Sequence, residues 1–312
     1  MTLKLSYTSA NTFPAKLLRS QNASELQPVH VQWIPTNVCN LNCPFCSCKY
    51  RNQTQEMDFD DAKRIIHELA GLGTKAATIT GGGEPLCHPR CADMIREFHA
   101  NGIEVGLVTN GIALHGFNRD ALAQATWCRI SNSDFRSMTP KYKQTLEDVT
   151  QIKIDWAFSH VVSDKPNLKE IGLIVDFANE HGFTHVRLVS DLMKPSESVF
   201  DGIRASLKGR DQRVIYQPRK DFVAESKCLI GYIKPVVAAD FRMYLCCGVQ
   251  YAIEGQEGDL PEALCMGTAK DFGAIYGGEK PPFSVPCDRC YYKDYNTVLE
   301  AMTADIEHEA FL

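Results

Sequence analysis

CNLNCPFCSC, residues 39–48, places four cysteines in ten positions directly after VHVQWIP (29–35), an alternating apolar stretch that predicts a β-strand. Cys39, Cys43 and Cys46 form a C-x3-C-x2-C arrangement, and Cys48 is a further thiol outside it. Structural zinc is closed by four ligands, usually in two separated pairs. Three thiols on one tight loop suit instead a [4Fe–4S] cluster that leaves one iron without a protein ligand. The stretch therefore predicts an iron–sulfur site that is open to chemistry.

The composition restricts the class of protein. The chain has 312 residues, of which 44% are hydrophobic, so it can bury a large core. It has thirteen cysteines, no signal-peptide pattern and no apolar run long enough to span a membrane. We therefore expect a cytoplasmic protein without membrane contact. A net charge of −5 gives no general attraction to nucleic acid, and only a basic run at 204–220 keeps such a partner open. The favoured interpretation of that run is a solvated helix and loop.

Strand and helix patterns alternate along the first two thirds of the chain. The strand patterns lie at 29–35, 75–80, 103–110, 127–132, 153–163 and 184–190, and the helical patterns at 60–73, 88–102, 119–125, 141–149 and 167–182. This alternation predicts an α/β fold, a parallel sheet wrapped by helices into a partial or full barrel. Reactive groups in such folds lie at the carboxyl ends of the strands. The cysteine loop follows the first strand and so lies at that end.

A glycine-rich segment, TGGGEP (80–85), follows the second predicted strand. Its glycines allow a close approach of the backbone to a ligand, and Glu84 supplies a carboxylate that can hold an amino group. A plain strand-to-helix turn is the alternative, and a lone glycine run does not decide between the two. The combination of this segment with the cysteine loop is far more specific.

With both motifs, the sequence resembles the radical S-adenosylmethionine (radical SAM) enzymes. The resemblance implies a partial (β/α)6 barrel, a [4Fe–4S] cluster that chelates S-adenosylmethionine, and a 5′-deoxyadenosyl radical formed after reduction by a donor such as flavodoxin or ferredoxin. It implies these site residues: Cys39, Cys43 and Cys46 as cluster ligands, and Phe45, Gly82, Gly83 and Glu84 at the cofactor. The ribose contacts would fall at Ser131, Asn132 and Asp134, where SNSDF matches the family only loosely. Adenine contacts stay unassigned.

The sequence changes in character after about residue 222. Helical periodicity fades, and KPVVAADFRMYLCCG (234–248) predicts two short strands turned at Ala239-Asp240, with a final helix from about Asn296. This part holds six cysteines and little apolar periodicity, so we expect it to depend on metal to fold. The predicted organisation is an N-terminal extension (1–28), a barrel (29–222) and a small C-terminal module (223–312).

The spacing of the C-terminal cysteines is similar to the twitch module of the same family, a shortened SPASM extension. That resemblance implies one auxiliary [4Fe–4S] cluster held by Cys228, Cys246, Cys287 and Cys290. Cys247 or Cys265 can replace one of the four, and a zinc ribbon is the alternative for this set. Cys48 is set aside, because the family pattern does not use it.

The sequence gives less information on the reaction itself, because the cofactor supplies the difficult chemical step. The auxiliary cluster most resembles that of 2-deoxy-scyllo-inosamine dehydrogenases, which favours oxidation of a substrate radical by electron loss to the second cluster. Little length precedes Val29 for a peptide-recognition domain, so we expect a small-molecule or nucleotide substrate. Peptide modification, rearrangement of a nucleoside or nucleic-acid base, and a non-catalytic metal-binding scaffold stay as alternatives. His160 and His185 are expected to be satisfied core groups without a catalytic role.

Overall fold

A ten-stranded, mostly parallel sheet organises the protein. The computed structural model describes residues 26–191, 198–218, 223–250, 260–278, 283–290 and 292–303. Seven consecutive parallel strands form most of the sheet: β1 (His30–Trp33), β2 (Ala76–Ile79), β3 (Glu104–Thr109), β4 (Trp127–Ser133), β5 (Asp155–Val162), β6 (His185–Ser190) and β7 (Val214–Gln217). The α/β class and the six expected strands are confirmed, and β7 is a seventh strand that the sequence patterns did not predict.

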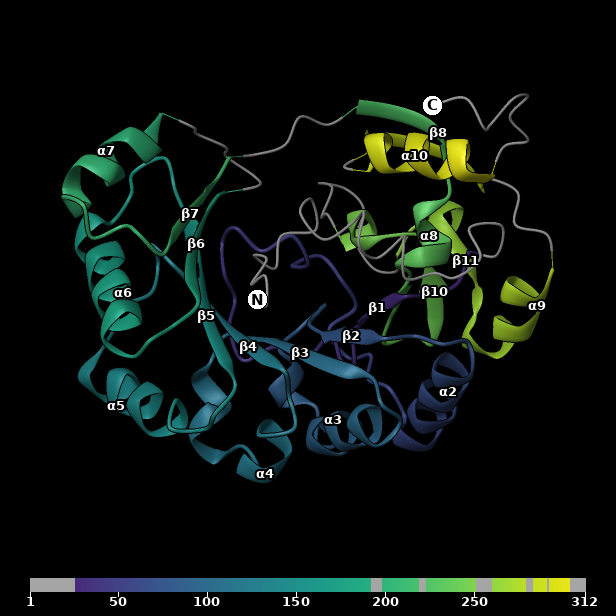
Figure 1. Ribbon diagram of the computed structural model, residues 1–312, viewed down its shortest axis with the longest axis horizontal. Helices are drawn as coiled ribbons and strands as arrows, with labels where there is room; N and C mark the ends of the chain where they lie inside the picture. The colour runs from purple at the N-terminus through teal and green to yellow at the C-terminus, as the bar shows by residue number, and fades with distance from the viewer. Residues whose placement is uncertain are drawn as a thin grey trace, which may run out of the picture.

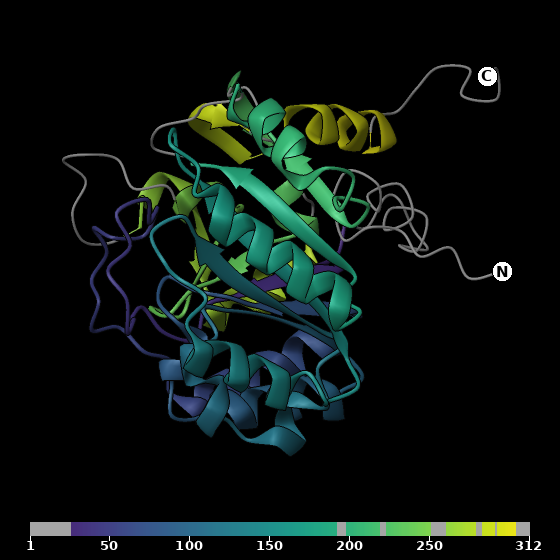
Figure 2. The ribbon, with the colours of Figure 1, turned by 90° about the vertical axis from the view of Figure 1, so that its left-hand side faces the viewer.

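Helices cover the outer, convex face of this curved sheet (Figures 1 and 2). They are α2 (Phe59–Gly71), α3 (Cys91–Ala100), α4 (Arg119–Leu122), α5 (Pro140–Val149), α6 (Leu168–Glu180) and α7 (Val199–Leu207), with 3-10 turns η1 (Pro85–Cys87) and η2 (Ile112–Gly116). Aromatic rings fill the layer between helices and strands. Phe158 of β5 stacks on Phe183 with 4.6 Å between ring centroids, and Trp33 of β1 meets Phe98 of α3 edge to face at 5.2 Å.

The first helix shows how local sequence sets these bounds. The carboxylate of Asp58 caps α2 by accepting hydrogen bonds from the backbone N–H groups of Asp60 and Asp61. The buried positions Ala62, Ile65, Ile66 and Leu69 recur at helical spacing and face the sheet. The chain then leaves the helix at Gly73, which has a φ of 83°.

The C-terminal part is joined to the barrel through the same sheet. β9 (Val236–Val237) pairs in parallel with β1, and β10 (Arg242–Tyr244) and β11 (Cys265–Thr268) continue outward as antiparallel strands. The expected hairpin at 234–248 is therefore confirmed. The predicted module boundary at 222/223 stays a prediction, and the β1–β9 pairing makes the sheet continuous across it. Most of the predicted N-terminal extension lies outside the described residues.

A second, two-stranded antiparallel sheet completes the described chain. It consists of β8 (Val223–Cys228) and β12 (Phe283–Cys290). The remaining helical elements are α8 (Ile230–Ile233), α9 (Phe272–Gly277) and α10 (Lys293–Thr303), with the short turns η3 (Cys247–Gln250), η4 (Glu262–Leu264) and η5 (Ala269–Asp271). Figure 1 shows α8 and α10 on the side of the sheet opposite α3, α4 and α5. No helix among the described residues combines the length and apolar character needed to cross a membrane.

Candidate functional site

The cysteine loop leaves the carboxyl end of β1, as predicted. Cys39 is exposed, and Cys43 and Cys46 are partly buried. The backbone N–H of Cys46 donates to the carbonyl of Cys43 at 3.1 Å, which turns the loop back on itself. Burial, followed by the neighbouring Cys39, raises the pKa of the Cys43 thiol, so these two sulfurs lie within electrostatic reach. The three motif thiols therefore gather on one open loop.

Cys48 has a different environment from the motif cysteines. Its side chain is buried, and its thiol points toward the carbonyl of Gly81 at 3.8 Å. The hydrogen bond that it shares with the Cys46 thiol raises the pKa of Cys46 and lowers that of Cys48 to about 6. Cys48 thus packs between the Cys46 thiol and the glycine segment, more deeply buried than the three motif cysteines.

The glycine segment is fastened to the stem of the cysteine loop. The backbone N–H of Gly83 donates to Thr36 at 2.9 Å, and that of Glu84 donates to Val38 at 2.8 Å. A Cβ on Gly82 would lie 1.8 Å from Asn37 Oδ1, and one on Gly83 would lie 2.0 Å from the Val38 carbonyl oxygen. The glycines are therefore required for close contact between two protein segments, a purpose that the sequence alone did not indicate.

Glu84 is buried at the centre of this arrangement. Its carboxylate accepts hydrogen bonds from the Thr109 hydroxyl at 2.6 Å, the Asn110 N–H at 2.7 Å and the Leu86 N–H at 3.1 Å. Burial raises the pKa of Glu84, and the three donors oppose that rise. An ionised carboxylate has about four acceptor positions, so these donors leave about one for a ligand amino group. Glu84 also ties the end of β2 to the end of β3.

Two further contacts bring in the loops after β3 and β4. The ring of Phe45 stacks on Phe135 with 5.9 Å between centroids and 23° between planes. The amide of Asn110 donates to Asn40 Oδ1 at 2.7 Å, and Arg136 donates to the Asn110 carbonyl. The ends of β1, β3 and β4 therefore meet at the cysteine loop. Sequence reasoning did not find the roles of Asn40, Phe135 and Arg136.

The three candidate ribose positions differ in what surrounds them. The side chain of Asn132 is buried, and its Nδ2 has no hydrogen-bond partner among the described residues. Asp134 instead faces protein donors, His160 Nε2 at 2.8 Å and the N–H of Ser163 at 2.7 Å. Burial would raise its pKa, but these donors hold the pKa of Asp134 below its usual value. Asn132 Nδ2 is thus unpaired but shut off from solvent. His160 is in the core as expected, but it is satisfied only at Nε2, because its buried Nδ1 has no partner among the described residues.

The four predicted auxiliary thiols are brought together from three segments. Cys228 ends β8, Cys287 and Cys290 lie on its partner β12, and Cys246 follows β10. Burial, followed by Cys287 and Cys290, raises the pKa of Cys228 to about 12. Burial, Cys247 and Cys228 raise the pKa of Cys246 in the same way. All four thiols therefore lie within electrostatic reach of at least one other member of the set.

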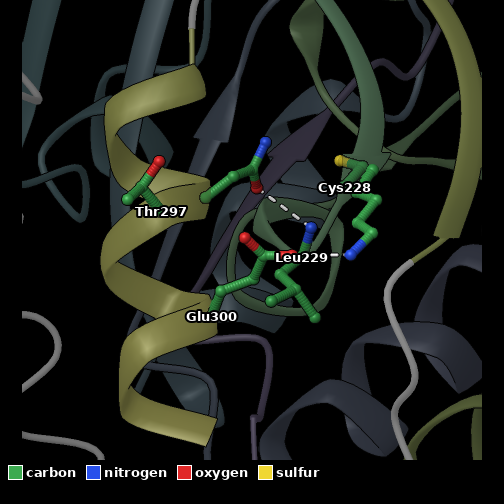
Figure 3. A pocket seen from close by; sticks show the side chains of 6 residues that line it. Cys228, Leu229, Thr297 and Glu300 are labelled. Carbon is green, nitrogen blue, oxygen red and sulfur yellow. Dashed lines mark hydrogen bonds and ion pairs between the residues drawn. The ribbon is translucent and has the colours of Figure 1, made fainter. Parts of the chain in front are cut away.

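The two alternative ligands, Cys247 and Cys265, differ in their contacts, and α10 lies beside Cys228. Cys247 lies beside Cys246 with its sulfur 3.4 Å from the Tyr292 hydroxyl, whereas Cys265 on β11 donates to the Gly267 carbonyl. A hollow beside Cys228 is lined by Thr297 and Glu300 of α10, and Figure 3 shows Glu300 reaching toward Leu229. Asn296 Oδ1 fixes that segment by accepting from the N–H groups of Leu229 and Ile230, each at 2.9 Å.

The donor chemistry of both sets fits iron–sulfur clusters. All thirteen cysteines are free thiols. Within the described ranges, no three His, Cys, Asp or Glu side chains converge tightly enough to hold a single metal ion. The ligands of an iron–sulfur cluster need not lie as close together as those of a single ion, because each thiolate binds a different iron of the cluster. Thiols that share a region without meeting at one point are therefore compatible with a cluster.

Comparison with known proteins finds a match in the first half of the chain. Residues 33–151, well under half of the chain, match the sequence model of the Radical SAM superfamily. The AdoMet-dependent heme synthase of Methanosarcina barkeri is 32% identical over 169 residues, which are 50% of this chain and 48% of the synthase. A GTP 3′,8-cyclase of Chlorobaculum tepidum is 37% identical over 99 residues, 31% of this chain and 29% of the cyclase. This chain thus matches about half of the synthase and under a third of the cyclase.

The fold has a counterpart among solved structures. Streptococcus suis SuiB bound to S-adenosylmethionine superposes with a TM-score of 0.62 at 15% identity, covering 86% of this chain and 69% of SuiB. At that identity the likeness is one of fold. It covers more of the chain than residues 33–151, and it agrees with a partial barrel.

Proposed function

We propose that this protein reductively cleaves S-adenosylmethionine and uses the 5′-deoxyadenosyl radical to abstract a hydrogen atom from a substrate inside the barrel. When bound, the cluster supplies the electron and an open iron for the amino and carboxylate groups of S-adenosylmethionine. Cys39, Cys43 and Cys46 are the proposed ligands of that cluster. The radical SAM domain and its resemblance to an AdoMet-dependent heme synthase support this chemistry.

The attachment of the glycine segment to the cysteine loop is the observation that carries the proposal. Because Gly83 and Glu84 donate backbone hydrogen bonds to Thr36 and Val38, a ligand held on the loop lies beside the Glu84 carboxylate. The remaining acceptor position of Glu84 would orient the amino group of the ligand. Ser131, Asn132 and Asp134, at the carboxyl end of β4, stay the proposed ribose contacts, and Ser131 is the one whose strand parity directs it to the inner face.

We extend the proposal to the C-terminal thiols. Cys228, Cys246, Cys287 and Cys290 would hold one auxiliary [4Fe–4S] cluster, which accepts an electron from the substrate radical or positions the substrate. Their mutual electrostatic reach supports this assignment. A net oxidation needs an electron donor only to start the cleavage, and flavodoxin or ferredoxin in the cytoplasm is the proposed source.

Anaerobic reconstitution tests both assignments. With dithionite and S-adenosylmethionine, the wild-type chain is expected to produce 5′-deoxyadenosine and to bind about eight irons. Cys43→Ala is expected to lose 5′-deoxyadenosine formation and about four irons. Cys287→Ala is expected to lose auxiliary iron but to keep cleavage, and Cys91→Ala, on α3 and outside both cysteine sets, serves as the control. No 5′-deoxyadenosine from the iron-loaded wild type would refute the proposed function.

A further inference from the structure

Strand register places two arginines on the inner, concave face of the sheet. On β4, Cys128 and Ile130 are fully buried toward the helices, so Arg129 and Ser131 face the opposite way. Pairing across β5 then places Arg129 in one row with Ala157 and His185. The next row toward the carboxyl ends contains Ser131, Ser159 and Arg187. Arg129 and Arg187 therefore lie in adjacent rows inside the barrel, on β4 and β6.

Neither arginine has an acidic partner within the described residues. Arg187 donates one hydrogen bond, from Nη2 to the Ser159 hydroxyl at 3.1 Å. The Nε atoms of both arginines are shut off from solvent and have no hydrogen-bond partner in the described part of the chain. Elsewhere in the described residues, six arginines pair with carboxylates: Arg64, Arg90, Arg96, Arg204, Arg210 and Arg242. Arg119, Arg136 and Arg213 donate to backbone carbonyls instead, and two nitrogens of Arg51 are buried without a partner in the described residues. The inner pair is set apart by its place on the concave face, where the two guanidinium groups repel each other.

The positive charge of this pair is costly in the absence of a ligand. Both side chains are partly buried, with their Nε atoms shut off from solvent. A guanidinium stays protonated in proteins, and withdrawing such a charge from water without a partner is destabilising. Burial lowers the pKa of Arg187 to about 10, and burial together with repulsion from Arg187 lowers that of Arg129. Burial and these two cations lower the pKa of His185 to about 4, so the histidine stays neutral beside them. The interior therefore holds concentrated positive charge that no described carboxylate balances.

We propose that Arg129 and Arg187 form an oxyanion-binding subsite, and that the substrate carries a phosphate or carboxylate group that binds there. This inference rests on the proposed function, since it names the class of substrate for the same barrel. A guanidinium offers paired N–H donors in a planar fork, which matches the two oxygens of a carboxylate or phosphate. Two forks on β4 and β6, on either side of β5, can hold one such group from two sides.

The position of the pair assigns it to the substrate rather than to S-adenosylmethionine. The carboxylate of S-adenosylmethionine would bind at the cysteine loop after β1 in the proposed function. Arg129 and Arg187 lie three and five strands farther along the sheet, in the order β1-β2-β3-β4-β5-β6. Arg187 nevertheless shares its row with Ser131, one of the proposed ribose contacts. An anion held by the pair therefore extends the rest of the substrate toward the cofactor.

Calorimetric titration of the reconstituted full-length protein tests the subsite. Inorganic phosphate and malonate serve as separate probes at constant ionic strength. The wild type is expected to bind at least one of them saturably, and the tighter probe tells a phosphate-bearing from a carboxylate-bearing substrate. Arg129→Met and Arg187→Met are expected to weaken that binding at least tenfold. Arg64→Met, which removes an exposed arginine from α2, is expected to leave it unchanged. Absence of wild-type binding, or unaltered binding by both inner variants, would overturn the subsite.

Two further readouts separate this role from others. Thermal unfolding without anion is expected to show a midpoint for Arg187→Met that equals or exceeds that of the wild type, because an unbalanced buried charge is removed. A lower midpoint, with no effect of phosphate on the wild-type midpoint, would indicate a structural role instead and would contradict the inference. Loss of S-adenosylmethionine affinity in both inner variants would assign the pair to the cofactor carboxylate and would also overturn it. Failure of the wild type to form 5′-deoxyadenosine would refute the proposed function but leave the anion titration interpretable.

Discussion

The Thr109 hydroxyl donates a 2.6 Å hydrogen bond to the buried carboxylate of Glu84, and so joins the ends of two neighbouring strands beneath the cysteine loop. The same carboxylate accepts the backbone N–H of Asn110, whose carbonyl in turn accepts from Arg136. A single acidic side chain thus connects the glycine segment with the loops after β3 and β4. The geometry around the open thiols depends on this network.

Removal of the Thr109 donor is expected to destabilise the protein measurably. Thr109→Val leaves a buried carboxylate with one donor fewer, and hydrogen bonds to charged groups contribute about 1.5–3 kcal/mol. Urea unfolding of the full chain should show a loss in that range. Thr145→Val, which removes an exposed hydroxyl on α5, is the control and is expected to change the free energy of unfolding by less than about 0.5 kcal/mol. Equal effects of the two variants would contradict the role assigned to Glu84.

A side chain at Gly83 is expected to separate the glycine segment from the cysteine loop. The added Cβ of Gly83→Ala would lie 2.0 Å from a backbone carbonyl oxygen, which cannot rotate away. Reduced iron content after reconstitution and weaker S-adenosylmethionine binding should follow. Gly71→Ala meets no atom within 4 Å and is expected to stabilise α2 by about 0.5–1 kcal/mol. Full iron content in Gly83→Ala would contradict this prediction, because the glycine segment and the cysteine loop could then move apart without loss of the cluster.

The stacked pair Phe45 and Phe135 is expected to protect the cysteine loop more than it stabilises the fold. Phe135 is 58% exposed, so Phe135→Ala removes little buried area. We expect a change in unfolding free energy below about 1 kcal/mol, the scale of an exposed aromatic contact. Faster loss of the cluster absorbance in air should accompany it, since the ring stacks directly on the loop. Leu168→Ala, at 43% exposure on α6, is the control, and cluster loss at the same rate in both variants would argue against a protective role.

His185 is expected to make stability fall on the acid side of neutrality. Its pKa is about 4 in the folded protein, against 6.5 for an unperturbed histidine. Between these values the unfolded chain binds more protons than the folded one, so the free energy of unfolding decreases as the pH falls. The contribution between pH 7.5 and pH 5 is about 2 kcal/mol, at 1.36 kcal/mol for each pKa unit.

Urea unfolding at the two pH values measures that contribution. His185→Asn is expected to flatten the decrease in unfolding free energy by the stated amount. His67→Asn changes an exposed histidine that pairs with Glu97 on the helical face, and is expected to keep a dependence close to that of the wild type. An unchanged slope in His185→Asn would mean that other groups cause the acid-side loss.

The elements that were predicted well are those with a local signal. The strand expected at 127–132 is observed at Trp127–Ser133, and the helix expected at 167–182 at Leu168–Glu180. Apolar periodicity within each element was sufficient to find both. β7 was missed because its four residues lie inside a basic run and carry too short an alternation. The pairing of β8 with β12 was missed because its partners are far apart in sequence.

In the site, too, the residues of short local motifs were predicted and their partners from distant segments were not. The cysteine spacing and Glu84 identified the site because each motif occupies only a few consecutive residues. The partners of those motifs, such as Thr109 and Phe135, come from other strand ends and depend on the register of the sheet. Arg129 and Arg187 carried no signal at all in sequence, since only the curvature of the sheet and the alternation of β4 and β6 direct them inward.

The pairing of β1 with β9 has a consequence for biosynthesis. During translation, β1 can pair with β2 early, but its other edge stays open until Val236 and Val237 have been made. An unpaired strand edge is a site for wrong associations, and such long-range pairing slows folding. The loop that carries the first three cysteines emerges from that same strand. The nascent chain therefore exposes its first three cysteines next to an unpaired strand edge. Because β9 is made so much later than β1, this topology allows a cluster to be inserted before the sheet is closed.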